Sequence, residues 1–220
     1  MGSTLQRVIA IDGPAASGKS SVARLLARRL GWVYVNTGAM YRVATLLALR
    51  RGVAERGRED EIARLVAESG AITFGIRDGT STLLLDGEDP GDALFSAEVN
   101  ALVSWVASIP AVRTALVVQQ RQFAVEHDVV MEGRDIGSVV FPDTPYKFYI
   151  DASPEVRARR RALQGRGADD LVQRDRQDAS RATSPLVIPK GAVVIDTSDL
   201  TLEEVVDRIE AHLRETGNFV

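Results

Sequence analysis

The sequence predicts an α/β fold in which a parallel β-sheet is covered by helices on both faces. Two observations predict it: short apolar runs typical of buried strands alternate with segments of helical periodicity, and the first such run leads through a glycine-rich turn into a helix. Alternating strands and helices form a parallel sheet, because each helix returns the chain to the same edge. With 220 residues, we expect one domain with appendages rather than two independent domains.

The first strand is predicted at residues 7–12, an apolar run bounded by a turn. A phosphate-binding loop follows, since the pattern G-x-x-x-x-G-K-[ST] is matched at each fixed position, Gly13, Gly18, Lys19 and Ser20. Apolar side chains with helical spacing then predict a helix over residues 20–30, with Gly31 as its stop. Strand, loop and helix therefore stand in the order that this motif requires.

This loop predicts a nucleoside triphosphate site, without fixing the reaction. Its backbone N–H groups converge on phosphate oxygens at the start of a helix, Lys19 reaches the β- and γ-phosphates, and Ser20 supplies a hydroxyl for Mg²⁺. A guanine-specific switch is not indicated, because no asparagine is followed by lysine, as N-K-x-D would require. The predicted triphosphate-binding residues are Gly13, Pro14, Ala15, Ala16, Ser17, Gly18, Lys19, Ser20 and Ser21.

A second strand, "WVYV", leads into "NTGAMYR" and a helix over about residues 36–51. Thr37 and Gly38 are predicted to cap this helix. Arg42 lies near its start, where the helix dipole and a guanidinium together favour an anion. An ordinary surface arginine is the alternative.

The middle of the chain predicts a β-hairpin followed by two helices. Apolar residues alternate from residue 72, Asp78 and Gly79 form a turn, and "STLLLDGED" supplies the partner strand. Two helices follow, separated at Pro110, with Ser104 and Arg113 on either side of the break. Apolar periodicity does not decide which way these two side chains point.

A charged cluster follows the next buried strand, residues 129–131. The strand emerges into Glu132, Gly133, Arg134, Asp135 and Gly137. Ligands of open parallel sheets collect at the carboxyl ends of strands, so this cluster predicts a binding site. A local ion pair between Arg134 and Asp135 is the alternative.

The rest of the chain predicts a strand at residues 146–151, a helix over about residues 153–164, a final strand "GAVVID" and a closing helix. Arginines crowd between Arg157 and Arg181. They predict either a solvated helix face or a cationic lobe that meets phosphates.

Composition limits the partners. The net charge of −3 argues against general attraction to nucleic acid, and no apolar run approaches the roughly 18 residues of a membrane span. The chain has no cysteine, which excludes disulfides and thiolate metal sites, and its first residues do not resemble a secretory signal. We expect a cytoplasmic protein and, because no apolar patch is evident in the sequence, a monomer.

Five motifs together resemble the bacterial cytidylate kinase family of P-loop nucleoside monophosphate kinases: "IDGPAASGKSS", "NTGAMYR", "DGED", "EGRDIGSVVFPD" and "DRQDASRATSPL". The resemblance covers nearly the whole chain. It implies a three-layer P-loop fold with a core of about residues 1–36, 100–156 and 183–220. A monophosphate-binding lobe of about residues 37–99 would contain the small antiparallel insert, and an arginine-rich lid would cover about residues 157–182.

The resemblance also implies a reaction, transfer of the γ-phosphoryl group of ATP to CMP or dCMP with Mg²⁺. Arg42, Arg134 and Arg181 would hold the CMP phosphate, Asp135 would accept a hydrogen bond from the cytosine amino group, and Asp178 would bond the ribose. Lys19, Arg134 and Arg181 would be the catalytic residues. The implied CMP-binding residues are Thr37, Arg42, Ser104, Arg113, Arg134, Asp135, Arg174, Asp178 and Arg181.

The chain departs from the family pattern in two places. The segment between the lid helix and Asp178 is shorter than in many members, and Thr37 stands where serine is often seen. The hydroxyl at Thr37 is retained, so we expect its role to be retained. Two other functions stay open: a kinase of the same fold for UMP, AMP or a shikimate-like acceptor, and a regulatory module that binds nucleotide without transferring phosphate.

Overall fold

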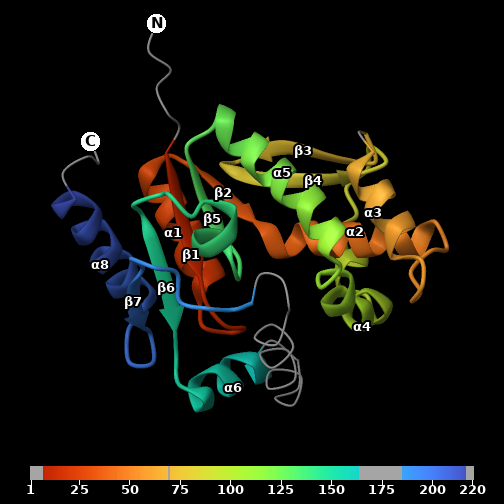
Figure 1. The fold of residues 1–220 in the computed structure, drawn as a ribbon. Coiled ribbons are helices and arrows are strands. Elements are labelled where there is room, and N and C mark those ends of the chain that lie inside the picture. Colours follow the sequence, from red (N-terminus) through yellow and green to blue (C-terminus); the bar gives the residue numbers. More distant parts are fainter. Residues whose placement is uncertain (1–6, 69, 164–184, 217–220) are drawn as a thin grey trace, which may run out of the picture.

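The computed structural model describes residues 7–68, 70–163 and 185–216. This part of the chain forms one seven-stranded sheet in the order β3-β4-β2-β5-β1-β6-β7, parallel throughout except between β3 and β4 (Figure 1). The strands are β1 Val8–Asp12, β2 Val33–Asn36, β3 Ile72–Arg77, β4 Thr80–Leu85, β5 Val129–Glu132, β6 Lys147–Asp151 and β7 Val193–Asp196. Every strand predicted from the sequence is present.

The helices connect the strands and cover the sheet. They are α1 Lys19–Leu30, α2 Thr37–Arg50, α3 Glu59–Ala67, α4 Ala97–Val106, α5 Pro110–Glu126, α6 Pro154–Leu163 and α8 Leu202–Glu215. Two short turns, the 3₁₀ helix η1 Gly91–Phe95 and the π-type turn η2 Ile136–Val140, complete the described part. The sequence did not predict α3, η1 or η2, because none of them carries a full stripe of helical periodicity.

Alternation along β1 assigns the two faces of the sheet. Ile9 and Ile11 pack in one apolar cluster with side chains of α1 and α8, whereas Val8 and Ala10 pack in another with Ala124 of α5 and with η2. The period-2 geometry of a strand sends successive side chains to opposite faces. The sheet is therefore covered on both sides, as predicted. The phosphate loop follows directly from the carboxyl end of β1, which is packed on both faces.

The hairpin extends the main sheet. Asp78 and Gly79 both have positive φ, 51° and 69°, as the predicted tight turn requires. Thr80 at the start of β4 pairs with Tyr34 of β2, so the hairpin becomes the outer edge of the core sheet. The division of the chain into core, lobe and lid stays a prediction.

In the described residues no single helix is long and apolar enough to cross a membrane. The α4–α5 pair reaches that length and composition only when its two helices are taken together, and it is bent by 94°.

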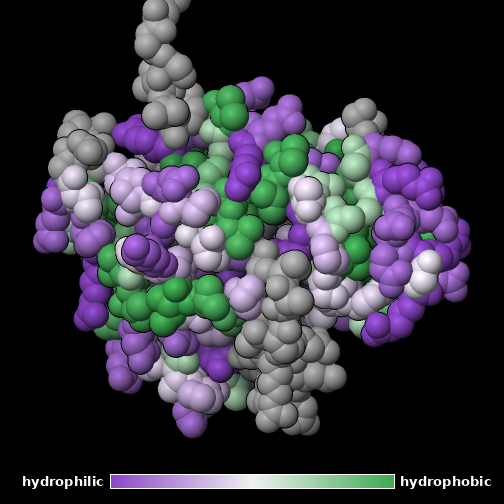
Figure 2. Space-filling model, in the orientation of Figure 1, coloured by the Kyte–Doolittle hydropathy of each residue, from purple (hydrophilic) through white to green (hydrophobic). Residues whose placement is uncertain are grey.

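Several apolar side chains remain exposed. Figure 2 shows apolar surface over α5 and near β7, and the exposed residues include Val118, Val125, Ile188 and Val194. The monomeric state therefore stays a prediction. It was based on the lack of an evident apolar patch in the sequence, and these exposed side chains no longer support that reason.

Candidate active site

The phosphate loop joins β1 to α1 as the motif predicts. Ala16 and Gly18 have left-handed backbones, with φ of 60° and 98°. Lys19 is 6% exposed, and its Nζ donates a hydrogen bond to the carbonyl oxygen of Pro14, 2.9 Å away. The ammonium group thus folds back over the loop, where phosphate oxygens can replace the carbonyl as its partner.

Gly13 cannot carry a side chain. Its φ is +151°, and an added Cβ would lie 2.1 Å from the carbonyl oxygen of Ile150 in β6. We expect Gly13→Ala to lower the free energy of unfolding by about 3–5 kcal/mol or to prevent folding, because backbone must move to relieve the overlap. Gly31→Ala is the matched control: its φ is +68° but nothing lies within 4 Å of the added Cβ, so only about 1–2 kcal/mol should be lost. Urea unfolding of both variants measures the difference, and equal losses would contradict this account.

A cavity of about 680 Å³ opens above the loop. Its wall combines the loop with the starts of α1 and α2, the inner side of η1, α4 and α5, and the end of β5. The predicted site residues that line it are Ala15, Ala16, Ser17, Gly18, Lys19, Ser20, Ser21, Thr37, Arg42, Ser104, Arg113, Arg134 and Asp135. Chain segments far apart in the sequence therefore bring residues predicted to bind the triphosphate and residues predicted to bind the acceptor to one cavity.

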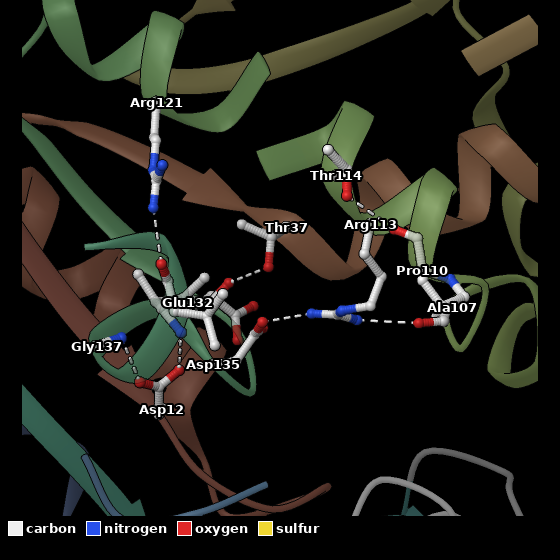
Figure 3. Close-up of polar contacts among 12 residues, drawn as sticks. Asp12, Thr37, Ala107, Pro110, Arg113, Thr114, Arg121, Glu132, Asp135 and Gly137 are labelled. Atoms are coloured by element: carbon white, nitrogen blue, oxygen red, sulfur yellow. Dashed lines mark hydrogen bonds and ion pairs between the residues drawn. The ribbon is translucent and has the colours of Figure 1, made fainter. Parts of the chain in front are cut away.

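Arg113 and Asp135, which both line this cavity, form a buried ion pair (Figure 3). Arg113 Nη2 donates to Asp135 Oδ2, and Arg113 Nη1 donates to the carbonyl oxygen of Ala107 at 3.0 Å. Its guanidinium also lies 5.2 Å from the ring centre of Tyr41. Asp135 thus has a charged partner on α5, so a purely local pair with Arg134 does not account for it.

Arg42 is held by residues of η1 and α4. Its Nη1 donates to the carbonyl oxygen of Leu94 and to Asn100 Oδ1, each at 2.9 Å, and its guanidinium lies 5.0 Å from the ring centre of Phe95. The side chain is buried at 9% exposure, so Arg42 is not an ordinary surface arginine. The guanidinium therefore lies at the cavity wall, and its two acceptors fix its orientation.

The cap of α2 differs from the prediction. Asn36, in an extended conformation, is the N-cap, and its Oδ1 accepts a hydrogen bond from the N–H of Ala39 at 3.1 Å. Thr37 is the first residue of the helix, and its hydroxyl donates to the carbonyl oxygen of Glu132 at 2.8 Å. The prediction that Thr37 and Gly38 cap α2 is therefore wrong, because β2 continues one residue further and places the Asn36 side chain over the first turn.

Glu132 is a site residue to which the sequence assigned no role. Its Oε1 accepts hydrogen bonds from Ser20 Oγ at 2.6 Å and from the Tyr34 hydroxyl at 3.1 Å. Burial, followed by the charge of Glu132, raises the pKa of Tyr34 well above its usual value, so this hydroxyl stays a donor. Its position in the sequence was the available signal. Glu132 ends β5, the strand that pairs with β1, and the phosphate loop begins at the same end of β1.

The hydroxyl oxygen of Ser20 is suited to bind a magnesium ion that is shared with a bound nucleotide. Ser20 lines the cavity beside Lys19, and its hydroxyl hydrogen is directed to Glu132, which leaves lone pairs on Oγ for a cation. Among the described residues no group of three or more His, Asp or Glu side chains could hold a metal by itself. A single hydroxyl ligand is compatible with Mg²⁺, because this ion takes few protein ligands and shares phosphate oxygens of a bound nucleotide.

Two arginines of α6 reach the phosphate loop. Arg160 Nη1 donates to the carbonyl oxygen of Ser17 at 3.0 Å, and Arg157 Nη1 donates to that of Ala15 at 3.3 Å. Arg160 also donates to the hydroxyl and the carbonyl oxygen of Thr197, both at 2.9 Å. The cluster is thus directed toward the loop. The predicted residues Arg174, Asp178 and Arg181 lie outside the described residues.

Both histidines pack against phenylalanine rings. His127 lies 5.0 Å from Phe123 between ring centres, and His212 meets Phe148 edge-on at 5.7 Å. Neither histidine lines the cavity above the phosphate loop.

Comparison with known proteins places this chain in a family. A family model described as cytidylate kinase matches residues 9–215. Proteins named cytidylate kinase from Limosilactobacillus fermentum and Caldanaerobacter subterraneus subsp. tengcongensis are 46% and 45% identical to this chain. The first match covers 94% of this chain and 96% of the relative, and the second covers 94% of each.

A solved structure of an uncharacterized protein from Eubacterium ventriosum shares the fold. The TM-score is 0.51 at 14% identity, and the match covers 96% of this chain and 99% of that one. On the strength of the family model and the two named relatives, this chain belongs to the cytidylate kinase family.

Proposed function

We propose that this protein transfers the γ-phosphoryl group of ATP to CMP or dCMP, giving ADP and CDP or dCDP. One observation carries the proposal: the phosphate loop with Lys19 and the buried Arg113–Asp135 pair line a single cavity. The loop suits the triphosphate of the donor, and the ion pair suits the polar edge of a base. Arg134, next to Asp135 in the chain, lines the same cavity and is proposed to bind the acceptor phosphate.

The chemistry needs positioning more than a protein nucleophile. The acceptor phosphate is itself the attacking group, so a strong general base is not required. Lys19, Arg42 and Arg134 bring positive charge toward two anionic substrates that would otherwise repel each other. Lys19 exchanges the Pro14 carbonyl for phosphate oxygens when donor binds. Arg174, Asp178 and Arg181 are proposed to complete the acceptor site from residues outside the described part.

Magnesium is part of this proposal. When bound beside the triphosphate, the ion neutralises charge on the β- and γ-phosphoryl oxygens. In this chain Ser20 would provide the direct ligand, and Glu132 would orient Ser20 by accepting its hydroxyl hydrogen.

The Arg113–Asp135 pair gives a physical basis for choosing cytosine. A carboxylate only accepts hydrogen bonds, so Asp135 favours the exocyclic amino group of cytosine over the carbonyl that uracil carries there. Arg113 pairs with this carboxylate, and Ser104 lines the same cavity.

Replacing Asp135 by asparagine is expected to lower the preference for CMP over UMP. The amide can donate to the uracil carbonyl, so the ratio of the two kcat/KM values should fall by about 10–100-fold, as expected for one base-edge contact. Parallel rate measurements with CMP and UMP test this, with Asp143→Asn as a control because Asp143 is exposed. An unchanged ratio would remove Asp135 from the base site.

The reaction is tested by ADP release from ATP and Mg²⁺ with CMP, dCMP, UMP, AMP, GMP or no acceptor. We expect ADP release that depends on CMP or dCMP and stays low without acceptor. A kinase must keep water away from the reacting phosphate, because a site open to water would hydrolyse ATP. Release that favours another acceptor would keep the fold and discard the cytosine assignment. The family match does not favour either of the other two functions. Cytoplasmic location and a monomeric state stay predictions.

A further inference from the structure

One buried carboxylate beside the site has no role in the scheme above. Asp12 is the last residue of β1, directly before Gly13 of the phosphate loop, and it is 1% exposed. Its two oxygens accept hydrogen bonds from backbone N–H groups on the other side of the site: Oδ1 from Ile136 at 2.8 Å and Oδ2 from Gly137 at 2.7 Å (Figure 3). These N–H groups open the η2 turn, and the first N–H groups of a helical turn have no partner within it.

The same turn is held at its far end by a cation. Arg121 of α5 donates to the carbonyl oxygens of Val140 and Val139 at 2.8 and 2.9 Å. In addition, the N–H of Gly133 donates to the carbonyl oxygen of Ile11 at 3.0 Å. The backbone between residues 133 and 140 is therefore fixed at three points, two of them on the strand that carries the phosphate loop.

Arg134 and Asp135 project from this fixed stretch. We propose that Asp12 is a positioning residue for the acceptor site: by holding the N–H groups of Ile136 and Gly137, it sets where Asp135 meets Arg113 and the acceptor. This inference rests on the proposed role of Asp135 at the base. A carboxylate is suited to the task because it can accept both N–H groups at once, whereas a neutral amide offers one oxygen.

The charges around Asp12 make its ionisation sensitive to pH. The pKa of Asp12 is raised to about 6: burial, and to a smaller extent nearby Asp135, raise it more than the two backbone N–H groups and Lys19 of α1 lower it. Lys147 of β6 also packs against Gly137, and its Nζ donates to the carbonyl oxygens of Pro142 and Lys190. Above pH 6 the carboxylate accepts both N–H groups; below it, one oxygen becomes a hydroxyl and one N–H loses its acceptor.

The test compares Asp12→Asn with a matched control. Asp128→Asn changes the same chemical group at the other end of the strand, where Asp128 accepts from the N–H of Arg7 at 2.6 Å and from Arg7 Nη2 at 3.0 Å. Asp128 lies outside the site, so its variant measures the cost of losing a carboxylate that only joins strands. A second variant, Gly137→Ala, places a Cβ 3.3 Å from Asp12 Oδ2, and also 3.1 Å from Pro189 Cγ and 3.2 Å from Lys147 Cγ, so it crowds the Asp12 contact together with two neighbouring side chains.

For Asp12→Asn we expect the KM for CMP to rise about 10-fold at pH 8, with the KM for ATP changed less than about 2-fold. Gly137→Ala should raise the KM for CMP in the same direction by a smaller factor, and it carries the test if Asp12→Asn does not fold. Asp128→Asn should leave both KM values unchanged while lowering the thermal midpoint.

The pH profile separates positioning from simple stabilisation. CMP titrates near pH 6 in its own phosphate, in wild type and variants alike, so the quantity to measure is the ratio of their KM values for CMP. We expect this ratio for Asp12→Asn to be about 10 above pH 7 and to approach 1 below pH 5.5, because wild type then carries a protonated Asp12. A ratio near 1 at every pH would overturn the proposal.

The result also separates this inference from the proposed base site. If Asp135→Asn changes the preference for CMP over UMP while Asp12→Asn leaves the KM for CMP unaffected, only the positioning role fails. If neither variant affects CMP, the base site itself is wrong, and the positioning role fails with it.

Discussion

Replacing Lys19 by methionine is expected to lower kcat by about 1000-fold. Methionine keeps the length and apolar stem of the side chain but removes the ammonium that stabilises charge on the transferring phosphoryl group, a loss comparable to removing a central transition-state donor. Lys19 lines the cavity, and its Nζ donates a hydrogen bond to the carbonyl oxygen of Pro14. Circular dichroism checks that the variant folds.

The control is Lys190→Met. The chain has three lysines, and Lys190 is the one whose side chain is exposed. Rates of ADP release with saturating ATP and CMP should be normal for Lys190→Met. A kcat for Lys19→Met within about 10-fold of wild type would show that the phosphate loop binds donor without stabilising transfer.

Replacing Glu132 by glutamine is expected to lower kcat by about 100-fold and to raise the Mg²⁺ concentration for half-maximal rate by about 10-fold or more. The amide keeps the size of the side chain and one acceptor oxygen, but it loses the charge that orients the Ser20 hydroxyl at 2.6 Å. The expected effect is therefore on the metal dependence, because Ser20 would no longer present its lone pairs in a fixed direction.

Magnesium titrations of the rate measure this effect, with Glu126→Gln as the control because Glu126 is an exposed residue at the end of α5. Tyr34→Phe removes the second donor to Glu132, at 3.1 Å, and should move the Mg²⁺ dependence in the same direction by a smaller factor. If Glu132→Gln kept the wild-type Mg²⁺ dependence, the bond between Glu132 and Ser20 would have no part in binding the ion.

Local patterns predicted the fold well because each depends on neighbours in the sequence. The continuous apolar run of β1, the stripe of α1 and the Asp78–Gly79 turn are set by side chains a few residues apart. The helix α3 was missed because its nine residues give only a short stripe of buried side chains. The α2 cap was wrong for a related reason, since one extra residue of β2 decides which polar side chain covers the first turn.

The sequence by itself determined the phosphate loop, because its donors are consecutive backbone N–H groups and its lysine lies beside them at a fixed spacing. It also determined the family resemblance, which the family model and two relatives confirm. Only the tertiary structure decided the partners of the charged side chains. Asp135 meets Arg113 from α5, Ser20 meets Glu132 across 112 positions, and Asp12 meets the η2 turn across more than 120. Such pairs form where separate strands and helices end at one edge of the sheet, and no local pattern states which of those ends will face each other.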